Sequence, residues 1–485
     1  MVLFTSSRCI RLIRSGLLAI GMASLLAAPA LADSSGPLTG GTIVKMPGIP
    51  TSSAPAWSAD ISWVDGSGTY YLADRTLKGI DVVDTNNNYV KTITGGFVGP
   101  KLRKNGTVDN DHSGPDGLVV IDSRREAWVG DGDSTVKVVD LNAGTVVASI
   151  STGGTARADE LAYDSKDGIV VIANDADDPP FLTFISVPNR TVLGKIPYPD
   201  ATDGLEQPQF IAANGMFYQA VPATKQNPGG QIDVIDPKAM KVAASYPVQN
   251  CVPHGLTVGP NQQLLLGCNS LKQHAQQQVM DATNGNILAV ITDIGGTDEV
   301  WYDSGTNRYY VAGSSMTSDG TKTGKPAPTL GVIDAGTYQY LGGVSTVPGT
   351  HSVAADPKTG RVIVPVPTKG LTVFTPTPLA KGQSISSSIT GSSGGATANS
   401  YVKGDGSDWT LTLSVSGPVD PGVSSRVGLA VWSSASTLPV FNGSLGLNRT
   451  SLTATVPAST AGATYTVQVF DYQPGFRLNY TLTAS

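Results

Sequence analysis

The sequence is poor in charged residues and lacks a helical pattern, and each shortage excludes a class of protein. Only 14% of the 485 residues are charged, and the formal net charge is -6. A mildly acidic composition argues against nucleic acid and against an anionic membrane, and we expect neither as a partner. Apolar residues do not recur at helical spacing, which argues against a helical fold. No apolar run after the N-terminal region resembles a membrane span.

Familiar catalytic motifs are also missing. The segment Gly391–Gly395 has the spacing of a nucleophile elbow, but it lies in a Ser/Gly-rich stretch rather than between a strand and a helix. The segment Gly320–Lys325 is one residue short of a phosphate-binding loop and is followed by Pro326. There is no His-Glu-x-x-His zinc motif and no haem-attachment motif. Motif matching therefore assigns no reaction.

The first 32 residues are predicted to be a signal peptide. They contain a basic region with three arginines, an apolar run (17–28) and Ala30-Leu-Ala32, which has the small-x-small form of a cleavage site. The apolar run is too short to span a bilayer comfortably, and no cysteine follows it directly, which disfavours a membrane or lipoprotein anchor. We therefore expect a periplasmic or secreted protein.

Only three cysteines are present, and Cys9 lies in the predicted signal peptide. In an oxidising compartment the other two, Cys251 and Cys268, are close enough in sequence to be expected as a disulfide. A metal or redox role fits less well, because there is no Cys-x-x-Cys and no third thiol. Closing a loop of about 17 residues would stabilise the fold by roughly 3 kcal/mol.

Glycine is abundant, with 56 residues, which suits a protein with many turns. The sequence between these turns shows a repeat of short predicted strands. Each repeat opens with a polar residue that leads two or three apolar residues and then a turn, as in His254-Gly-Leu-Thr-Val. The opening residue recurs at a spacing of 44 to 56 residues, at Asp60, Asp116, Glu160, Gln209, His254, Glu299 and His351. A second apolar strand, a third that ends near an aspartate, and a fourth complete the repeat.

Four short strands in each repeat are typical of the blades of a propeller. The seventh repeat has three strands before Pro376, and Gly41–Met46 has the pattern of the missing fourth strand. The sequence therefore predicts an all-β fold whose main part (33–376) is a seven-bladed β-propeller. Closure by the N-terminal strand would remove two open sheet edges.

The repeat resembles that of the seven-bladed YVTN-type propellers, typified by YncE-like exported proteins and lactonase-like propellers. The resemblance rests on Pro-His-Gly-Leu at Pro253–Leu256, a turn and an apolar strand, Val-Ile-Asp at Val234–Asp236, and a Thr- or Ala-led fourth strand. It covers roughly residues 41–376 and implies the propeller fold. It leaves the function open, because these propellers include lactonases, lyases, cofactor-bearing subunits and proteins without activity.

The composition changes after the propeller. Residues 377–399 are rich in Ser, Gly and Thr and are predicted to be a linker. Residues 400–485 alternate apolar and polar positions, for example in Trp409–Val415 and Tyr465–Phe470, which predicts a small C-terminal β-sandwich. Adhesion, glycan binding and packing on the propeller are all open as its role.

In a propeller the first strand of each blade faces the central channel, so the seven opening residues are expected to converge. Four carboxylates, one amide and two imidazoles can bind a divalent metal ion (calcium, magnesium or a first-row transition metal) or share protons. His254, Glu299 and His351 come from consecutive repeats and form a two-histidine, one-carboxylate set, which suits a metal ion with open positions. This set resembles the channel site of virginiamycin-B-lyase-like propellers. The alternative is a channel rim that binds only water.

His112 is a further candidate acid/base residue. It lies in Asp109–Asp116, whose first half is similar to a calcium-binding loop but lacks the closing glutamate. Because His112 is close in sequence to Asp116, it is expected to project over the channel mouth.

Two functions follow from these observations. The first is a metal-dependent hydrolase or lyase of lactonase-like type, with His254, Glu299, His351 and His112 as ligands or acid/base groups for a small-molecule substrate. The alternative is a non-catalytic binding or scaffold protein of the cell envelope, which would use propeller loops and the C-terminal sandwich to bind a ligand such as a glycan. The sequence does not decide between them, and it leaves the substrate and the oligomeric state open.

Overall fold

The computed structural model describes residues 36–485 except 50–56, 273, 392–394, 417–425, 435, 437 and 447. The predicted signal peptide and Cys9 lie outside the described residues. The described chain consists of strands and loops with three short 3-10 helices, η1 (Asn110–His112), η2 (Asp122–Arg124) and η3 (Pro260–Gln262). None of the helices in this part of the chain is long and apolar enough to cross a membrane.

The strands β1 to β28 form seven four-stranded antiparallel sheets in the described part of the chain, numbered here in chain order. Sheet 1 contains β2 (Ala59–Val64), β3 (Tyr70–Asp74), β4 (Gly79–Val83) and β5 (Tyr89–Thr94), and sheet 2 contains β6 (Leu118–Ile121), β7 (Glu126–Asp131), β8 (Thr135–Asp140) and β9 (Thr145–Ser151). Sheet 3 contains β10 (Leu161–Asp164), β11 (Ile169–Asn174), β12 (Phe181–Ser186) and β13 (Thr191–Pro197), and sheet 4 contains β14 (Pro208–Ile211), β15 (Met216–Val221), β16 (Gln231–Asp236) and β17 (Lys241–Pro247). Sheet 5 contains β18 (Pro253–Val258), β19 (Gln263–Cys268), β20 (Gln277–Asp281) and β21 (Ile287–Ile291). Sheet 6 contains β22 (Val300–Asp303), β23 (Arg308–Gly313), β24 (Thr329–Asp334) and β25 (Tyr340–Ser345). Sheet 7 contains β26 (Ala354–Asp356), β27 (Arg361–Val366), β28 (Gly370–Pro376) and β1 (Leu38–Val44).

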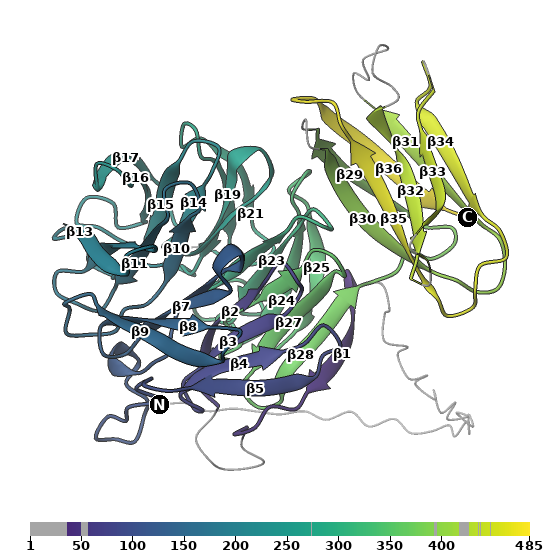
Figure 1. Cartoon of the computed structure of the whole chain (residues 1–485). Coiled ribbons are helices and arrows are strands. Elements are labelled where there is room, and N and C mark those ends of the chain that lie inside the picture. The colour runs from purple at the N-terminus through teal and green to yellow at the C-terminus, as the bar shows by residue number, and fades with distance from the viewer. Residues whose placement is uncertain are drawn as a thin grey trace, which may run out of the picture. The chain divides into compact units, whose positions relative to one another are not determined.

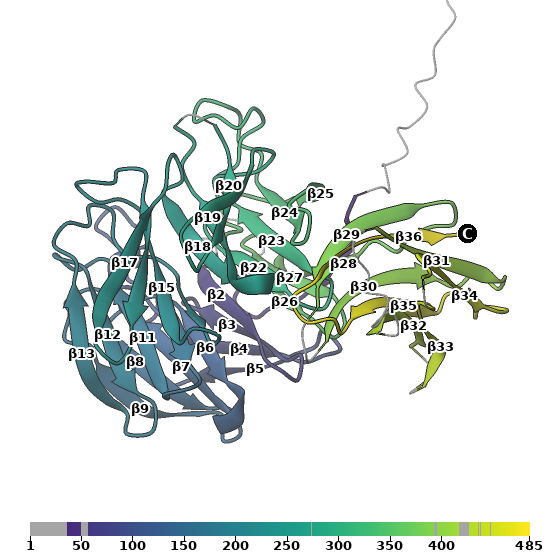
Figure 2. The same cartoon turned by 90° about the horizontal axis from the view of Figure 1, so that it is seen from above.

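These sheets pack face to face as in a β-propeller (Figures 1 and 2). Their second and third strands are largely buried on both faces, as in β3 and β4, where every residue is buried. The fourth strands, such as β9, alternate between exposed and partly buried residues because one face lies against solvent. Seven hydrophobic clusters each join two consecutive sheets, and one of the seven joins sheet 7 to sheet 1.

The first strands of the sheets lie next to one another. The strand β2 contacts β6 on one side and β26 on the other, and the intervening first strands contact their neighbours in chain order. The strand β1 pairs antiparallel with β28, with Leu38 opposite Pro376 and Val44 opposite Leu371. The structure starts this N-terminal strand three residues before the sequence pattern does, and a bulge between Gly40 and Thr42 interrupts the alternation that the pattern relies on.

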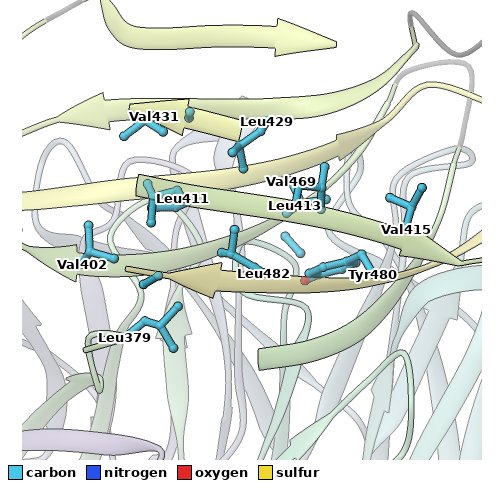
Figure 3. Packing of buried hydrophobic residues seen from close by; sticks show 14 of the residues in the cluster. Leu379, Val402, Leu411, Leu413, Val415, Leu429, Val431, Val469, Tyr480 and Leu482 are labelled. Carbon is cyan, nitrogen blue, oxygen red and sulfur yellow. The ribbon is translucent and has the colours of Figure 1, made fainter. Parts of the chain in front are cut away.

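The last eight strands form a C-terminal two-sheet unit (384–484). One sheet has the order β29 (Ser384–Thr390), β36 (Arg477–Ala484), β31 (Trp409–Ser416) and β34 (Ser451–Val456), and the other has the order β30 (Ala396–Lys403), β35 (Thr464–Asp471), β32 (Val427–Ser433) and β33 (Pro439–Ser444). One apolar cluster fills the space between them, with Leu411, Leu413 and Leu482 fully buried (Figure 3). Side chains of alternate residues point into this cluster, as the period-2 pattern predicts.

The segment predicted as a linker contains a strand. Ser384–Thr390 forms β29 and pairs with β36 along its whole length, and β30 begins at Ala396. Ile385 and Ile389 are the only apolar residues of this strand, and both pack against the apolar cluster. Two isoleucines in a Ser/Thr-rich stretch are a weak alternation, so composition concealed the strand.

A buried carboxyl pair in sheet 1 links stability to pH. Asp74 on β3 and Asp81 on β4 are both fully buried, and Trp57 Nε1 donates to Asp74 Oδ2 at 2.6 Å. Burial, together with the charge of Asp74, raises the pKa of Asp81 to about 9. In the unfolded chain this carboxyl ionises near its ordinary pKa of 3.8, so the folded state loses stability as the pH rises from that value toward 9.

We predict that Asp81→Asn stabilises the protein at pH 8 and changes little at pH 4. The asparagine keeps the shape of the side chain and removes the ionisation that opposes folding at high pH. Melting temperatures measured by calorimetry from pH 4 to 9 test this, with Asp200→Asn, which removes an exposed carboxyl, as the control. A constant difference between Asp81→Asn and the wild type at all pH values would contradict the assignment.

Candidate functional site

A polar cavity of about 500 Å³ lies at the N-terminal ends of the first strands. Its charged lining comes from six of the seven sheets or their preceding loops and consists of Asp60, Arg75, Arg157, Asp159, Glu160, Glu206, His254, Asp298, Glu299 and His351. Six carboxyl groups thus face two guanidinium and two imidazole groups, and half of these ten residues are buried while the others are partly exposed.

Strand register shows which residues are equivalent between sheets. Leu161 pairs with Ile172 and Val300 pairs with Val311, so both open their strands at the same level. The position two residues earlier is occupied in the seven sheets by Asp60, Asp116, Asp159, Glu206, His254, Asp298 and His351, which we call the outer row. The position one residue earlier is occupied by Ile61, Gly117, Glu160, Gln207, Gly255, Glu299 and Ser352, which we call the inner row. Every residue of the outer row can ionise.

The residues predicted from sequence are divided between these rows. Asp60, Asp116, His254 and His351 belong to the outer row, while Glu160 and Glu299 belong to the inner row. Gln209 belongs to neither, because it lies on β14 two positions beyond Gln207 and does not line the polar cavity. The sequence analysis missed three outer-row acids, Asp159, Glu206 and Asp298. Each directly precedes a polar inner-row residue, and this doublet was the signal that could have revealed them.

His112 does not reach the cavity. It ends η1, its side chain is 43% exposed, and its Nδ1 lies 3.2 Å from Asp109 Oδ2. Asn110 of the same short helix lines the cavity instead. The expected projection of His112 over the mouth is therefore wrong, because the 3-10 turn directs the histidine back toward its own loop.

Arg75 neutralises the acids of sheets 1 and 2. Its guanidinium contacts Asp60, and its Nε donates to Asp116 Oδ1 at 2.8 Å. His351 Nε2 lies 2.9 Å from Asp60 Oδ1. Burial opposes ionisation of Asp60, but the charge of Arg75 and the contact with His351 hold the pKa of Asp60 below its usual value. Burial dominates at Asp116 and raises the pKa of that carboxyl well above its usual value.

Arg157 has the same role in sheet 3. Its guanidinium nitrogen Nη2 lies 2.7 Å from Asp159 Oδ2 and 2.8 Å from Asp175 Oδ2. Neither arginine stands at a repeated position: Arg75 follows β3, and Arg157 precedes β10. Periodicity could not have identified them.

His254 joins two outer-row carboxylates. Its Nδ1 lies 3.1 Å from Asp298 Oδ1 and 3.3 Å from Glu206 Oε1. Burial works against the imidazolium, but the charge of Glu206 and the contact with Asp298 prevail and raise the pKa of His254 to about 9. Burial raises the pKa of Glu206 to about 7. Asn269 Nδ2 lies 3.2 Å from His254 Nε2.

Two groups of three potential metal ligands occur among the described residues. In each group the donor atoms lie within 4.8 Å of one another, and the groups are Glu206, His254 and Asp298, and Asp60, Asp116 and Asp159. Arg75 already contacts two carboxylates of the second group. The set of two histidines and one carboxylate predicted from the sequence is not kept together. His254 belongs to the first group, whereas Glu299 and His351 belong to neither.

Three inner-row residues, Ile61, Glu160 and Glu299, line the cavity, and we call this part of the lining its floor. Glu299 Oε2 accepts a hydrogen bond from Gln207 Nε2 at 2.9 Å, and burial raises the pKa of Glu299 to about 8. Burial and the charge of Glu299 raise the pKa of Glu160 well above its usual value. Glu160 Oε2 is buried and has no hydrogen-bond partner in the part of the chain that the structure describes. A smaller cavity of about 140 Å³ adjoins these residues and is lined by Trp63 and Trp301 among others.

The predicted disulfide between Cys251 and Cys268 is confirmed, with a sulfur–sulfur distance of 1.99 Å. It joins the approach to β18 with the end of β19. Ser270 N also donates to Cys251 O at 3.0 Å, and Asn269 N donates to Val252 O at 3.2 Å. These links hold Asn269 beside His254, so the disulfide supports the site as well as the fold.

Comparison with known proteins adds little to this geometry. No family model matches the chain, and no curated protein matches it. Among solved structures it is similar to a chain of the crystal structure of the mitotic checkpoint complex, with 11% identity and a TM-score of 0.49 over 75% of this chain and 99% of that chain. A likeness this distant transfers neither fold nor function. Membership of the YVTN-type family stays a prediction from the sequence motifs.

We predict that Arg75→Gln lowers the free energy of unfolding by about 3 kcal/mol at pH 7, because it leaves buried carboxylates without their cation. Urea unfolding measures the change. Arg103→Gln is the control, since Arg103 pairs with Asp109 at an exposed site and its loss should change stability by less than about 1 kcal/mol.

Adding Asp116→Asn to Arg75→Gln should restore part of the lost stability, because the second substitution removes a carboxyl that the first leaves unpaired. A double variant no more stable than Arg75→Gln would show that Arg75 stabilises the fold by packing rather than by charge.

Proposed function

We propose that this chain is an exported, closed seven-bladed β-propeller that binds a divalent metal ion in the polar cavity. Closure is supported by the apolar cluster between sheets 7 and 1, by the contact between β2 and β26, and by the pairing of β1 with β28. Export to the periplasm or medium is supported by the disulfide, which persists in oxidising compartments. The C-terminal two-sheet unit would be a separate β-sandwich that starts near Ser384.

The observation that carries the metal proposal is the group Glu206, His254 and Asp298. One imidazole nitrogen and two carboxylate oxygens lie within 4.8 Å of one another and come from the starts of three consecutive sheets. Glu160 lines the same cavity with a buried, unpartnered oxygen, which offers a further ligand. Mixed nitrogen and oxygen donors suit a first-row ion such as Mn²⁺ or Zn²⁺ better than Ca²⁺, which takes oxygen ligands.

The charge balance of the cavity supports a cation. Its lining has more carboxyl groups than arginines and histidines together, and buried like charges raise one another's pKa. A bound divalent ion would relieve this repulsion without any movement of the strands. The sequence pattern predicted Glu299 and His351 as ligands beside His254. Glu206 and Asp298 take their place in this proposal, and both already contact His254.

A second candidate is catalysis by the same site, as a metal-assisted hydrolase or lyase. It is favoured by Glu160 and Glu299, two carboxyl groups with raised pKa values on the cavity floor. Groups that hold a proton near neutral pH can act as general acids or bases toward a substrate on the metal ion. Without such a reaction, the propeller would serve as a metal-dependent binding or scaffold protein.

The metal proposal predicts one tightly bound Mn²⁺ or Zn²⁺ ion per chain. The purified protein is dialysed against buffer that contains the metal ion in trace amounts, and elemental analysis then measures the stoichiometry. Calorimetric titration measures the affinity. We expect His254→Ala and Asp298→Asn each to weaken binding by at least about 100-fold, more than the loss of an outer-shell partner costs. His112→Ala, which changes a histidine outside the cavity, is the matched control.

Retention of wild-type affinity by His254→Ala would refute the site, and absence of any bound ion in the wild type would refute metal binding. Circular dichroism of each variant establishes that it is folded, so that lost binding reflects lost ligands.

A further inference from the structure

A second hollow adjoins the polar cavity. It has a volume of about 460 Å³ and shares His254 and Asn269 with the cavity. Its outer wall is formed by residues of two loops and includes Lys272 and Lys322. Because His254 lines both spaces, the imidazole lies at the boundary between the cavity and the hollow.

Two loops hold the lysines on one wall. The loop after β19 carries Lys272 and the loop after β23 carries Lys322. Lys322 N donates to Leu271 O at 3.2 Å, and Ala275 N donates to Gly320 O at 2.6 Å. Gly320 has a φ of +68°, and a Cβ there would come within 2.7 Å of the His274 ring. Glycine therefore permits the close approach that brings the two loops together.

The charges of this wall are not balanced locally. Both lysines are exposed, and neither has an ion pair with another described residue, in contrast to Lys137 and Lys381. Asp203 is the one carboxyl group among the lining residues of the hollow. The cavity lining is rich in carboxylates, and the adjoining wall is cationic, so the site has charges of opposite sign at its two ends.

We propose that the hollow binds the anionic group of a small molecule whose other end coordinates the metal ion. The proposal rests on the metal site proposed above. A metal ion with three protein ligands keeps open coordination positions, and an ion at His254 would lie beside the hollow that this residue lines. Carboxylate and phosphate groups are the anions that a hard ion coordinates and that an ammonium group binds. The ligand class is therefore a small carboxylic acid or phosphate ester.

The opposite signs of the charges in the two adjoining spaces distinguish this ligand from a simple cation. A cation alone would satisfy the carboxylates but would leave the two ammonium groups without a counterion. A molecule with an anionic group close to a metal-binding oxygen satisfies both ends at once. Electrostatic complementarity of this kind gives specificity as well as affinity.

The test uses the full chain loaded with Mn²⁺ and titrated by calorimetry with L-malate and, separately, with inorganic phosphate. The double substitution Lys272→Ala and Lys322→Ala should lower the affinity for the anion by roughly fivefold or more, as expected for the loss of two exposed charge contacts. The affinity for Mn²⁺ should not fall. Replacing both lysines by arginine should retain anion binding.

The control is Lys238→Ala with Lys241→Ala, which removes two charges near the hairpin between β16 and β17 and should leave anion affinity unchanged. Binding of malate alone identifies a carboxylate ligand, and binding of phosphate alone identifies a phosphate ligand. Binding of neither anion, or equal affinities of the wild type and the Lys272/Lys322 double variant, overturns the proposal.

Failure of the metal site is distinguishable from failure of the anion subsite. If the wild type binds no Mn²⁺, the proposed function is wrong, whatever the lysines do. If Mn²⁺ binds as predicted but anion affinity does not depend on the lysines, the metal site stands and only the inference about the hollow is lost.

Discussion

The arrangement of the cavity depends on how carboxylates crowded at one end of the sheets are kept from repelling one another. Five of the seven outer-row residues are acids, and three of them, Asp60, Asp116 and Asp159, are buried away from water. Arg75 and Arg157 each lie between two carboxylates, so sheets 1 to 3 balance their charge with residues of their own. The cations do not offset burial equally, because Arg75 and His351 hold the pKa of Asp60 below its usual value whereas burial raises the pKa of Asp116 well above it.

The sequence predicted the propeller because a propeller repeats one hydrophobic pattern, and the apolar strands that carry the pattern are the ones that pack between sheets. Predicting the site was harder, because a row of equivalent side chains depends on strand register. The hairpin between β2 and β3 is one residue longer than that between β10 and β11, and both β2 and β18 contain bulges at the cavity. A shift of one residue moves a side chain to the other face, and spacing alone does not reveal it.

Single residues that balance charge are the least predictable part of the site. Arg75, Arg157 and Asn269 stand at positions that do not recur in the other repeats, and the contacts they make span up to 41 residues of sequence. The predictable residues were those that repetition itself marked, such as His254 and His351. The strand β29 was missed for a related reason, since its inward positions alternate isoleucine with serine and the segment reads as a polar linker.

The uneven distribution of cations divides the cavity into two halves with different capacities. In sheets 1 to 3, together with His351, every outer-row acid contacts an arginine or that histidine. In sheets 4 to 6 the outer row consists of Glu206, His254 and Asp298, and no arginine lines the cavity there. An imidazole can give up its proton and become a metal ligand, which a guanidinium cannot do. In the second half His254 is the cation between the two outer-row carboxyl groups, and this half adjoins the hollow that Lys272 and Lys322 line. The repeat supplies equivalent positions in all seven sheets, but residues that depart from the repetition determine which cation lies beside each outer-row acid.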